Sequence, residues 1–105
     1  MAEHMSKELC LLWIDKGFKL NGRWAVRKTY DKHYPAYMDN NGVEHAPQTR
    51  TFATDITFNT DEKTFSITRG AMIEGVFIPI KEDEFKISIE TLRLICKTVK
   101  ELGWT

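Results

Sequence analysis

The residues best suited to chemistry or binding lie between positions 23 and 37. All three tyrosines of the 105-residue chain fall in this stretch, close to Trp24. Its four Lys and Arg side chains against one Asp give a local net charge of +3, although the whole chain has 15 basic and 15 acidic residues. Aromatic faces and cations on one strand can stack nucleic-acid bases, hold phosphates or anchor a protein partner. We therefore place the candidate site in this stretch.

Strand geometry divides the stretch into two faces, because successive side chains of a strand point to opposite sides. In a strand over residues 23–30, Trp24 and Val26 point into the core, and Lys28 lies at the margin of that face. Arg23 and Arg27 share the exposed face, where their guanidinium groups can fork onto phosphate or carboxylate. The chain that follows is expected to form a loop with partly exposed tyrosine rings. The predicted binding residues are Arg23, Arg27, Lys32, Tyr34 and Tyr37.

Two classes of binding function fit these residues. We favour a small non-enzymatic protein that binds another protein, as an accessory or inhibitor protein does, because tyrosine and arginine are common interface anchors. The alternative is nucleic-acid binding, in which bases stack on Trp24, Tyr30 or Tyr34 and nearby lysines contact the phosphates. An ordinary half-buried strand with solvated lysines would show the same pattern.

A third class, a small enzyme without a recognisable motif, would need a pocket that combines distant residues such as His33, Glu44 and His45. The sequence has no glycine-rich phosphate loop and no G-x-S-x-G motif. Two histidines fall short of a zinc site, and residues 39–42 lack the glycine and acidic positions of a calcium loop. We therefore expect no enzymatic activity, no cofactor and no metal. The acidic residues at 82–84 are expected to form a solvated loop before the last helix.

Composition bounds the partner and the compartment. Zero net charge gives no overall attraction to nucleic acid or anionic lipid, and the longest apolar run, residues 9–14, is too short to cross a membrane. Cys10 and Cys96 lie in apolar surroundings, so we expect both to be free and buried in a reducing cytoplasm, with a disulfide as the less favoured alternative. The charged start indicates no signal peptide. Residues 1–4 resemble a cloning remnant, so we expect one domain over residues 5–105.

The clearest secondary-structure prediction is a helix within residues 87–105. Ser88 is a good N-cap, and Gly103 offers the left-handed conformation that ends many helices. The helix is expected to bury one apolar stripe, with Trp104 folding back onto its last turn. The predicted stripe consists of Leu92, Ile95, Cys96, Val99 and Leu102.

Alternation of apolar and polar residues predicts strands upstream of this helix. Residues 52–58 and 64–68 alternate on either side of five polar residues, which predicts a hairpin. Two glycines bound a predicted turn or bulge at residues 70–75. Residues 76–80 alternate again, and Pro79 makes them an edge strand, through which a homodimer could form.

The first half of the chain carries two Asn-Gly turn signals, at residues 21–22 and 41–42, and each predicts a hairpin. At the first turn we expect Phe18 to lie opposite Trp24. Residues 6–16 fit either a short capped helix or a buried strand, and we expect a strand because a hairpin follows directly. Together these elements predict an α+β domain, in which an antiparallel sheet of about five strands is crossed by one C-terminal helix.

Overall fold

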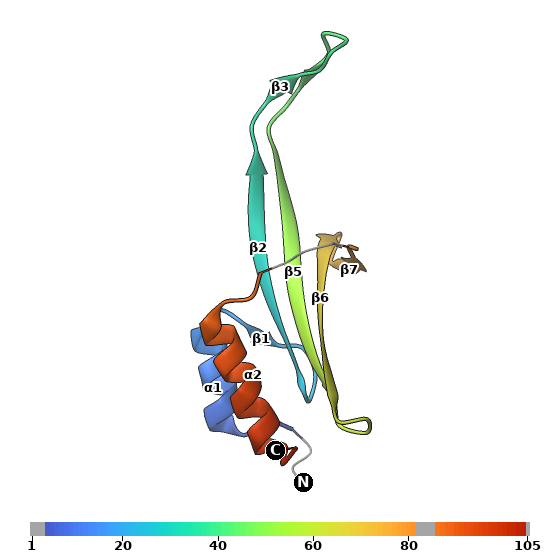
Figure 1. Ribbon diagram of the computed structural model, residues 1–105. Helices are drawn as coiled ribbons and strands as arrows, with labels where there is room; N and C mark the ends of the chain where they lie inside the picture. Colours follow the sequence, from blue (N-terminus) through green and yellow to red (C-terminus); the bar gives the residue numbers. More distant parts are fainter. Residues whose placement is uncertain (1–3, 82–85, 105) are drawn as a thin grey trace.

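A long antiparallel sheet and a pair of helices form the fold of the computed structural model (Figure 1). The structure describes residues 4–81 and 86–104, so the acidic cluster at 82–84 lies outside the described residues. Within them, the helices are α1 (Lys7–Asp15) and α2 (Ile89–Glu101). The sheet has the spatial order β1 (Lys19–Leu20), β2 (Ala25–Tyr34), β5 (Gln48–Asn59), β6 (Thr64–Ile73) and β7 (Val76–Pro79). A second, two-stranded sheet pairs β3 (Tyr37–Met38) with β4 (Glu44–His45). The predicted α+β fold is confirmed.

Helix α2 begins and ends where the sequence predicts. The side chain of Ser88 accepts a hydrogen bond from the Thr91 backbone N–H at 3.1 Å, which caps the first turn. Gly103 adopts a φ of 77° after the last turn. The Trp104 backbone N–H then donates to the Val99 carbonyl at 3.2 Å, so the chain folds back onto the helix as expected.

The buried face of α2 differs from the predicted stripe. Leu94 and Thr98 are buried, whereas Leu92 and Cys96 are exposed. The cause is α1, which packs beside α2, so that α2 buries a side towards α1 as well as a side towards the sheet. The indole N–H of Trp13 in α1 donates to the Thr98 hydroxyl at 3.0 Å. The buried threonine is therefore a partner for the neighbouring helix.

Residues 7–15 form helix α1, so the prediction of a strand is wrong. The Ser6 side chain caps the helix by accepting a hydrogen bond from the Leu9 backbone N–H at 3.2 Å. Leu9 and Trp13 are one turn apart and both are buried, as the period of a helix requires. Ser6 also donates its backbone N–H to Glu101 of α2 at 3.0 Å. A strand would have put Leu11 on the same face as Leu9 and Trp13, whereas Leu11 is 55% exposed.

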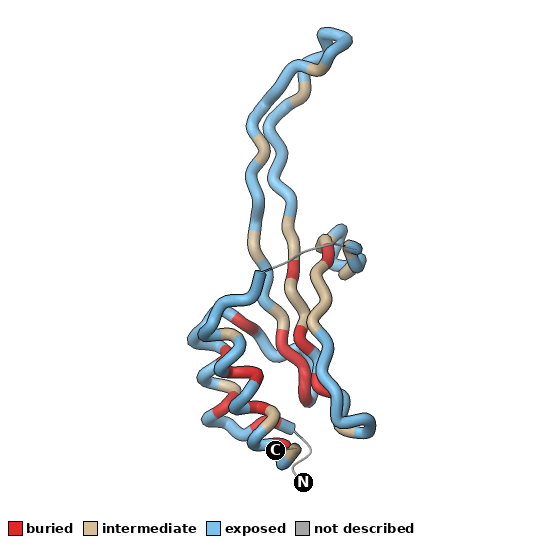
Figure 2. The backbone as a smooth tube through the Cα atoms, in the orientation of Figure 1, coloured by how far each residue is buried: buried red, intermediate tan, exposed pale blue. Residues whose placement is uncertain are grey.

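The hydrophobic core lies at one end of the molecule, where the helices cover the sheet (Figure 2). Val26, Ile56 and Trp13 are fully buried there, and Trp24 is 7% exposed. The predicted inward orientation of Trp24 and Val26 is thus confirmed. Because Trp24 belongs to the core, it is not available to stack a nucleic-acid base.

The turns confirm some of the predictions and correct others. The hairpin between β5 and β6 and the edge position of β7 are confirmed. Leu20 lies opposite Val26, so the expected pairing of Phe18 with Trp24 is wrong. Residues 21–24 join β1 to β2, so this loop is longer than a two-residue turn. Trp24 packs into the core from this loop. Strand β6 also continues through Gly70, and the turn before β7 consists of Glu74 and Gly75 alone.

Strands β2 and β5 extend beyond the rest of the sheet as a two-stranded arm (Figure 1). Their pairing runs from Ala25 opposite Thr57 to Tyr34 opposite Gln48, and β6 accompanies β5 only as far as Thr51. We call residues 31–51 the arm. The molecule measures 60 × 26 × 25 Å, and its radius of gyration is 17.2 Å, against about 13 Å for a compact domain of this size. None of the described helices has the length and apolar character to span a membrane.

Candidate functional site

The arm is one continuous hairpin centred on Asn41. Tyr37 and His45 pair at four residues on either side of this position, and Tyr34 pairs with Gln48 at seven residues. Pro35 and Pro47 fall six residues on either side, and neither has an N–H to donate. The strand ladder is interrupted at these prolines, so the end of the hairpin forms its own small sheet. We call residues 35–47 the arm tip.

Strand pairing gives the arm two chemically different faces. Lys32 lies opposite Arg50 on one face, whereas Asp31 lies opposite Thr51 and accepts its hydroxyl hydrogen bond at 2.7 Å on the other. The face of Lys32 is the same side of the sheet that the helices cover at the core. Lys28 and Tyr30 lie on this side closer to the core, between Lys32 and the helices. We call the following set the cation–aromatic face: Lys28, Tyr30, Lys32, Tyr34, Arg50, Phe52 and Arg69.

Cations on this face lie over aromatic rings. The Lys32 ammonium and the Arg50 guanidinium are each 5.4 Å from the centre of the Tyr34 ring. Arg69 lies 5.5 Å from the ring centre of Tyr30. Such contacts hold the long side chains in place on this face. The predicted residues Lys32 and Tyr34 are therefore brought together, and they are joined by Arg50.

Arg27 lies on the opposite face and already has a carboxylate partner. Its Nε and one terminal nitrogen donate to the two oxygens of Asp55 at 2.6 and 2.8 Å. The Phe77 ring covers the guanidinium, with 5.0 Å from Cζ to the ring centre. The hydrogen bond to Asp55 raises the pKa of Arg27, so the guanidinium remains charged. The fork expected to bind an external group therefore joins β2 to β5.

Arg23 lies at the far end of the molecule from Tyr37. It occupies the turn before β2, where its carbonyl accepts the Met5 backbone N–H at 3.4 Å. A hollow of about 380 Å³ adjoins its side chain, next to Trp24 and Phe58. The five predicted binding residues thus occupy three places: the base, the opposite face of the sheet, and the arm.

The arm tip exposes apolar side chains on an ordered turn. Tyr37 is 58% exposed, Met38 66% and Val43 54%. The ring of Tyr37 stacks on the ring of His45, with 4.5 Å between centres and 6° between planes. Exposed apolar groups at the end of an arm have no core of their own to fill, so they are suited to contact another molecule.

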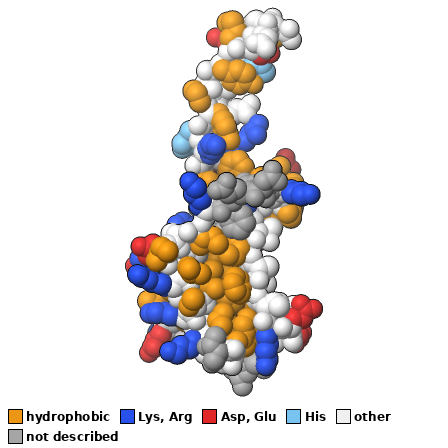
Figure 3. Space-filling model, in the orientation of Figure 1, with side chains coloured by type: hydrophobic (Ala, Val, Ile, Leu, Met, Phe, Trp, Pro, Cys, Tyr) orange, Lys and Arg blue, Asp and Glu red, His pale blue; other side chains and the backbone are white. Residues whose placement is uncertain are grey.

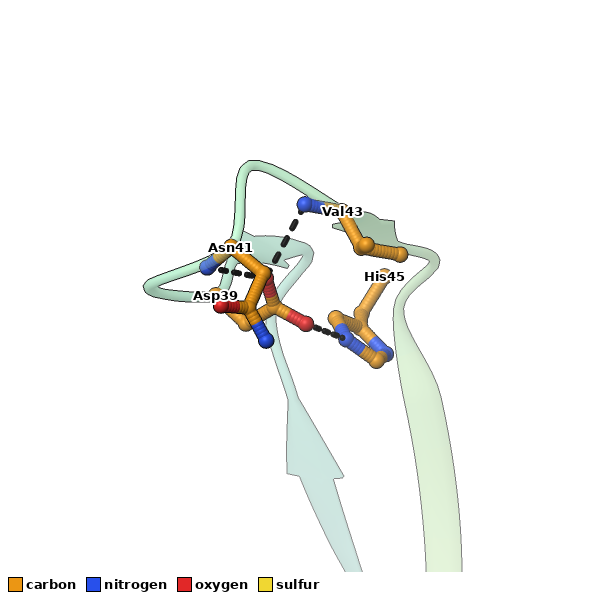
Figure 4. A network of polar contacts seen from close by, with 4 residues as sticks. All are labelled: Asp39, Asn41, Val43 and His45. Carbon is orange, nitrogen blue, oxygen red and sulfur yellow. Dashed lines mark hydrogen bonds and ion pairs between the residues drawn. The ribbon is translucent and has the colours of Figure 1, made fainter.

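Asp39 organises the turn of the arm tip (Figure 4). One of its carboxylate oxygens accepts the backbone N–H groups of Asn41 and Val43, each at 2.9 Å. The other oxygen lies 3.0 Å from Nε2 of His45, and this nitrogen must be the donor because a carboxylate only accepts. The Asp39 side chain therefore fixes both the loop and the ring on which Tyr37 stacks.

We predict that acid releases the turn of the arm tip. The hydrogen bond from His45 and then that from the Val43 N–H lower the pKa of Asp39. A lowered pKa in the folded state stabilises the turn above the ordinary aspartate pKa of about 3.9, and this stabilisation is lost as the pH falls through the lowered value. In NMR titrations the Asn41 and Val43 amide signals should shift together, with a midpoint below about 3.9.

The Asp39→Asn variant is the control for this titration, because it has no carboxyl group at position 39. Its Asn41 and Val43 signals should lack the acid transition, because the amide oxygen of asparagine accepts the same two backbone N–H groups at every pH. A midpoint at or above the ordinary aspartate value would contradict the role that we assign to Asp39.

The three residues considered for an enzyme pocket have separate surroundings. His33 contacts the Thr49 hydroxyl at 2.9 Å on the arm, whereas His45 contacts Asp39 at the tip. Glu44 and His45 are neighbours in β4, so their side chains point to opposite sides. Within residues 4–81 and 86–104, no group of three His, Cys, Asp or Glu side chains is placed to hold a metal ion.

The two cysteines are free, as predicted, but neither is fully buried. Cys10 is half-buried and Cys96 is exposed, because α2 turns a different side towards the core. Partial burial raises the pKa of the Cys10 thiol above its ordinary value, and the nearby Glu101 carboxylate raises it further. A raised thiol pKa leaves little nucleophilic thiolate at neutral pH.

Sequence reasoning missed Arg50 and Asp39 as parts of a site. The signal for Arg50 was the Asn41-Gly42 turn, which brings Arg50 within one residue of Lys32 in the pairing, and the observed pairing of Asp39 with Val43 sets the two side by side. The signal for Asp39 was its place two residues before the turn, where an aspartate commonly accepts backbone N–H groups. Comparison of the chain with family models, with curated proteins and with solved structures gave no match.

Proposed function

We propose that this chain is a non-enzymatic binding protein that attaches to another protein through its arm, as an accessory or inhibitor protein does. The observation that supports this most is the arm tip, which carries Tyr37, Met38 and Val43 exposed at the end of a 60 Å molecule. A projecting hairpin can enter a cleft that a compact surface could not reach.

The order of the arm tip supports a role in binding. Association costs conformational entropy when a loop must be ordered, and a loop already fixed by hydrogen bonds avoids most of that cost. Asp39 holds two backbone N–H groups, and the stack of His45 on Tyr37 fixes an aromatic side chain of the kind that often anchors interfaces. The tip therefore presents its apolar groups in one arrangement.

Charge supports a protein partner for the arm tip rather than a polyanion. Residues 35–47 contain two acids, Asp39 and Glu44, and no Lys or Arg. A hairpin that lay along a nucleic-acid groove would be repelled by the acids near its tip. Zero net charge for the whole chain agrees with the same choice.

A site-specific photo-crosslinker at Met38 tests this proposal in cells that express the chain. A protein should be trapped at position 38, because this side chain is 66% exposed at the arm tip. The matched control carries the crosslinker at Glu62, in the exposed turn between β5 and β6 at the opposite end. The trapped protein is then identified by mass spectrometry.

The second half of this test uses the triple variant Tyr37→Ser, Met38→Ser, Val43→Ser, which should lose the trapped partner on affinity purification. A control variant, Ile73→Ser with Val76→Ser, removes side chains of similar exposure, 53% and 60%, from the turn before β7. It should retain the partner. Equal recovery by both variants would overturn the proposal.

We also propose an oligomeric state and a cellular compartment for this chain. Strand β7 has an unpaired outer edge among the described residues, so a homodimer through this edge is compatible with a free arm. Two free cysteines agree with a reducing compartment, and we propose the cytoplasm.

A further inference from the structure

We infer that the cation–aromatic face is a second binding site, independent of the arm tip, and that it binds single-stranded nucleic acid. This inference goes beyond the function proposed for the arm. It rests on the order in which cations and rings follow one another, on the charge of the face, and on two hollows beside it.

Cations and rings alternate along the face. Along β2, the order is Lys28, Tyr30, Lys32 and Tyr34, with about 6.6 Å between successive side chains on the same side of a strand. Arg50 of β5 lies beside Lys32 and doubles the second cation position. A single strand of nucleic acid presents phosphates and bases in the same alternation, and proteins bind it by pairing cations with the backbone and rings with the bases.

The three strands supply only basic charged side chains to this face. Asp31 and Asp55 of the paired strands both point to the opposite side, where Asp55 is held by Arg27. In the described parts of β2, β5 and β6, no acidic side chain lies on the cation–aromatic face. Lysine and arginine side chains appear along the lower arm in Figure 3. A patch of this kind attracts phosphate locally although the whole chain is neutral.

Two hollows flank the rings in the middle of the face. Tyr30 and Phe52 stack on each other, with 5.7 Å between ring centres and 26° between planes. Tyr30 forms part of a hollow of about 240 Å³, together with Lys28 and Lys86. Phe52 forms part of another hollow of about 650 Å³, together with Arg50 and Glu74. Each hollow thus pairs a ring with a cation, as a base and its phosphate would require.

The rings favour nucleic acid over an acidic protein segment. The carboxylates of an acidic protein segment would pair with the cations and would leave the rings unused. The half-buried rings next to the hollows provide surfaces on which the flat bases of nucleic acid can stack. A duplex would keep its bases inside, so the rings would gain nothing from it. The ligand that uses every element of the face is therefore a single strand.

Fluorescence anisotropy with a labelled 12-nucleotide oligothymidylate tests the inference. Three to four phosphate contacts predict that affinity falls about 20–50-fold between 50 and 200 mM salt, since each contact contributes about 0.7 to the logarithmic slope for single strands. The variant Lys32→Glu with Arg50→Glu should lose binding by at least about tenfold and should show a smaller slope. The variant Lys32→Gln with Arg50→Gln should do the same to a lesser degree, should the charge reversal impair folding.

Three further variants test whether binding depends on the cation–aromatic face. Lys63→Glu with Lys97→Glu makes the same change in net charge outside the face, and it should leave affinity nearly unchanged. Phe52→Leu keeps every charge and should weaken binding about tenfold by removing a stacking surface. The triple serine variant of the arm tip should bind the oligonucleotide normally, which separates this site from the proposed protein-binding function.

Four results would overturn the inference. They are no binding at 50 mM salt, affinity insensitive to salt, equal loss in the Lys63 and Lys97 control, and equal binding of a polyglutamate peptide of the same charge. The last result would assign the face to an acidic protein instead.

Discussion

Replacing Trp13 with alanine is expected to lower the free energy of unfolding by about 3–5 kcal/mol. Trp13 is fully buried, and its ring meets the edge of Phe18 with 4.9 Å between centres. The loss removes a large side chain from a core that the surroundings cannot refill. A domain of this size has a total stability of about 5–15 kcal/mol, so a substantial fraction of it would be lost.

Urea unfolding followed by far-UV circular dichroism measures this change. Leu11→Ala is the matched control, because it truncates an apolar side chain of the same helix that is 55% exposed. It should cost well under about 1 kcal/mol, as surface substitutions usually do. A Trp13→Ala cost as small as that of the control would contradict the placement of α1 against the core.

The hydrogen bond of Trp13 can be separated from its packing. Its N–H donates to Thr98, whose own hydroxyl donates to the Leu94 carbonyl at 2.8 Å. Trp13→Phe should therefore cost more than Trp104→Phe, since the indole nitrogen of Trp104 has no hydrogen-bond partner within the described part of the chain. Removing the Trp13 N–H loses a buried hydrogen bond. Removing the Trp104 N–H, which has no such bond, removes the free-energy cost of burying an unpaired polar group.

Local signals were enough to predict the helix α2 and the hairpin of β5 with β6. Ser88 and Gly103 bound the helix through chemistry confined to a few neighbouring residues, and such chemistry is legible in a sequence. The prediction failed where a partner decided the outcome. The predicted stripe of α2 was wrong because α1 covers Thr98, and a strand over residues 6–16, as predicted, would have offered no helix to cover it.

The candidate site was predictable in part. The Asn41-Gly42 signal fixes the pairing of the arm only to within one residue. A two-residue turn would place Lys32 opposite Thr51, whereas the observed turn over residues 40–42 places it opposite Arg50. The fate of Arg27 does not follow in this way. Its partner Asp55 is 28 residues away, and the ring of Phe77 comes from a strand that joins through β6. Which arginine remains available to a ligand is therefore decided by tertiary contacts, which alternation along one strand does not reveal.

Replacing Gly70 with alanine is expected to destabilise the sheet by about 1–3 kcal/mol, as overpacking usually does. A Cβ at this position would lie 2.6 Å from the Ile78 carbonyl oxygen and 2.6 Å from the ring of Phe77. The backbone oxygen cannot move without disturbing the pairing of β6 with β7. Ala53, fully buried beside Gly70, is the second small residue that makes room on this face.

The ring of Phe77 links this clash to Arg27. Because the ring covers the guanidinium at 5.0 Å, displacing it should expose the pair of Arg27 with Asp55 to water as well as weaken β7. Urea unfolding and amide exchange of β7 measure the two effects. Ser66→Ala is the control, since it changes an exposed position on the same strand and face and should leave both unchanged.

A double variant identifies which contact dominates. If the ring is the main obstacle, Gly70→Ala in a Phe77→Ala background should cost clearly less than in the wild-type chain, because the two positions interact directly. If the Ile78 carbonyl dominates, the cost should be the same in both backgrounds. Wild-type stability of the single variant would contradict the close approach of β7 to β6, and with it the role of Phe77 in holding Arg27 away from a ligand.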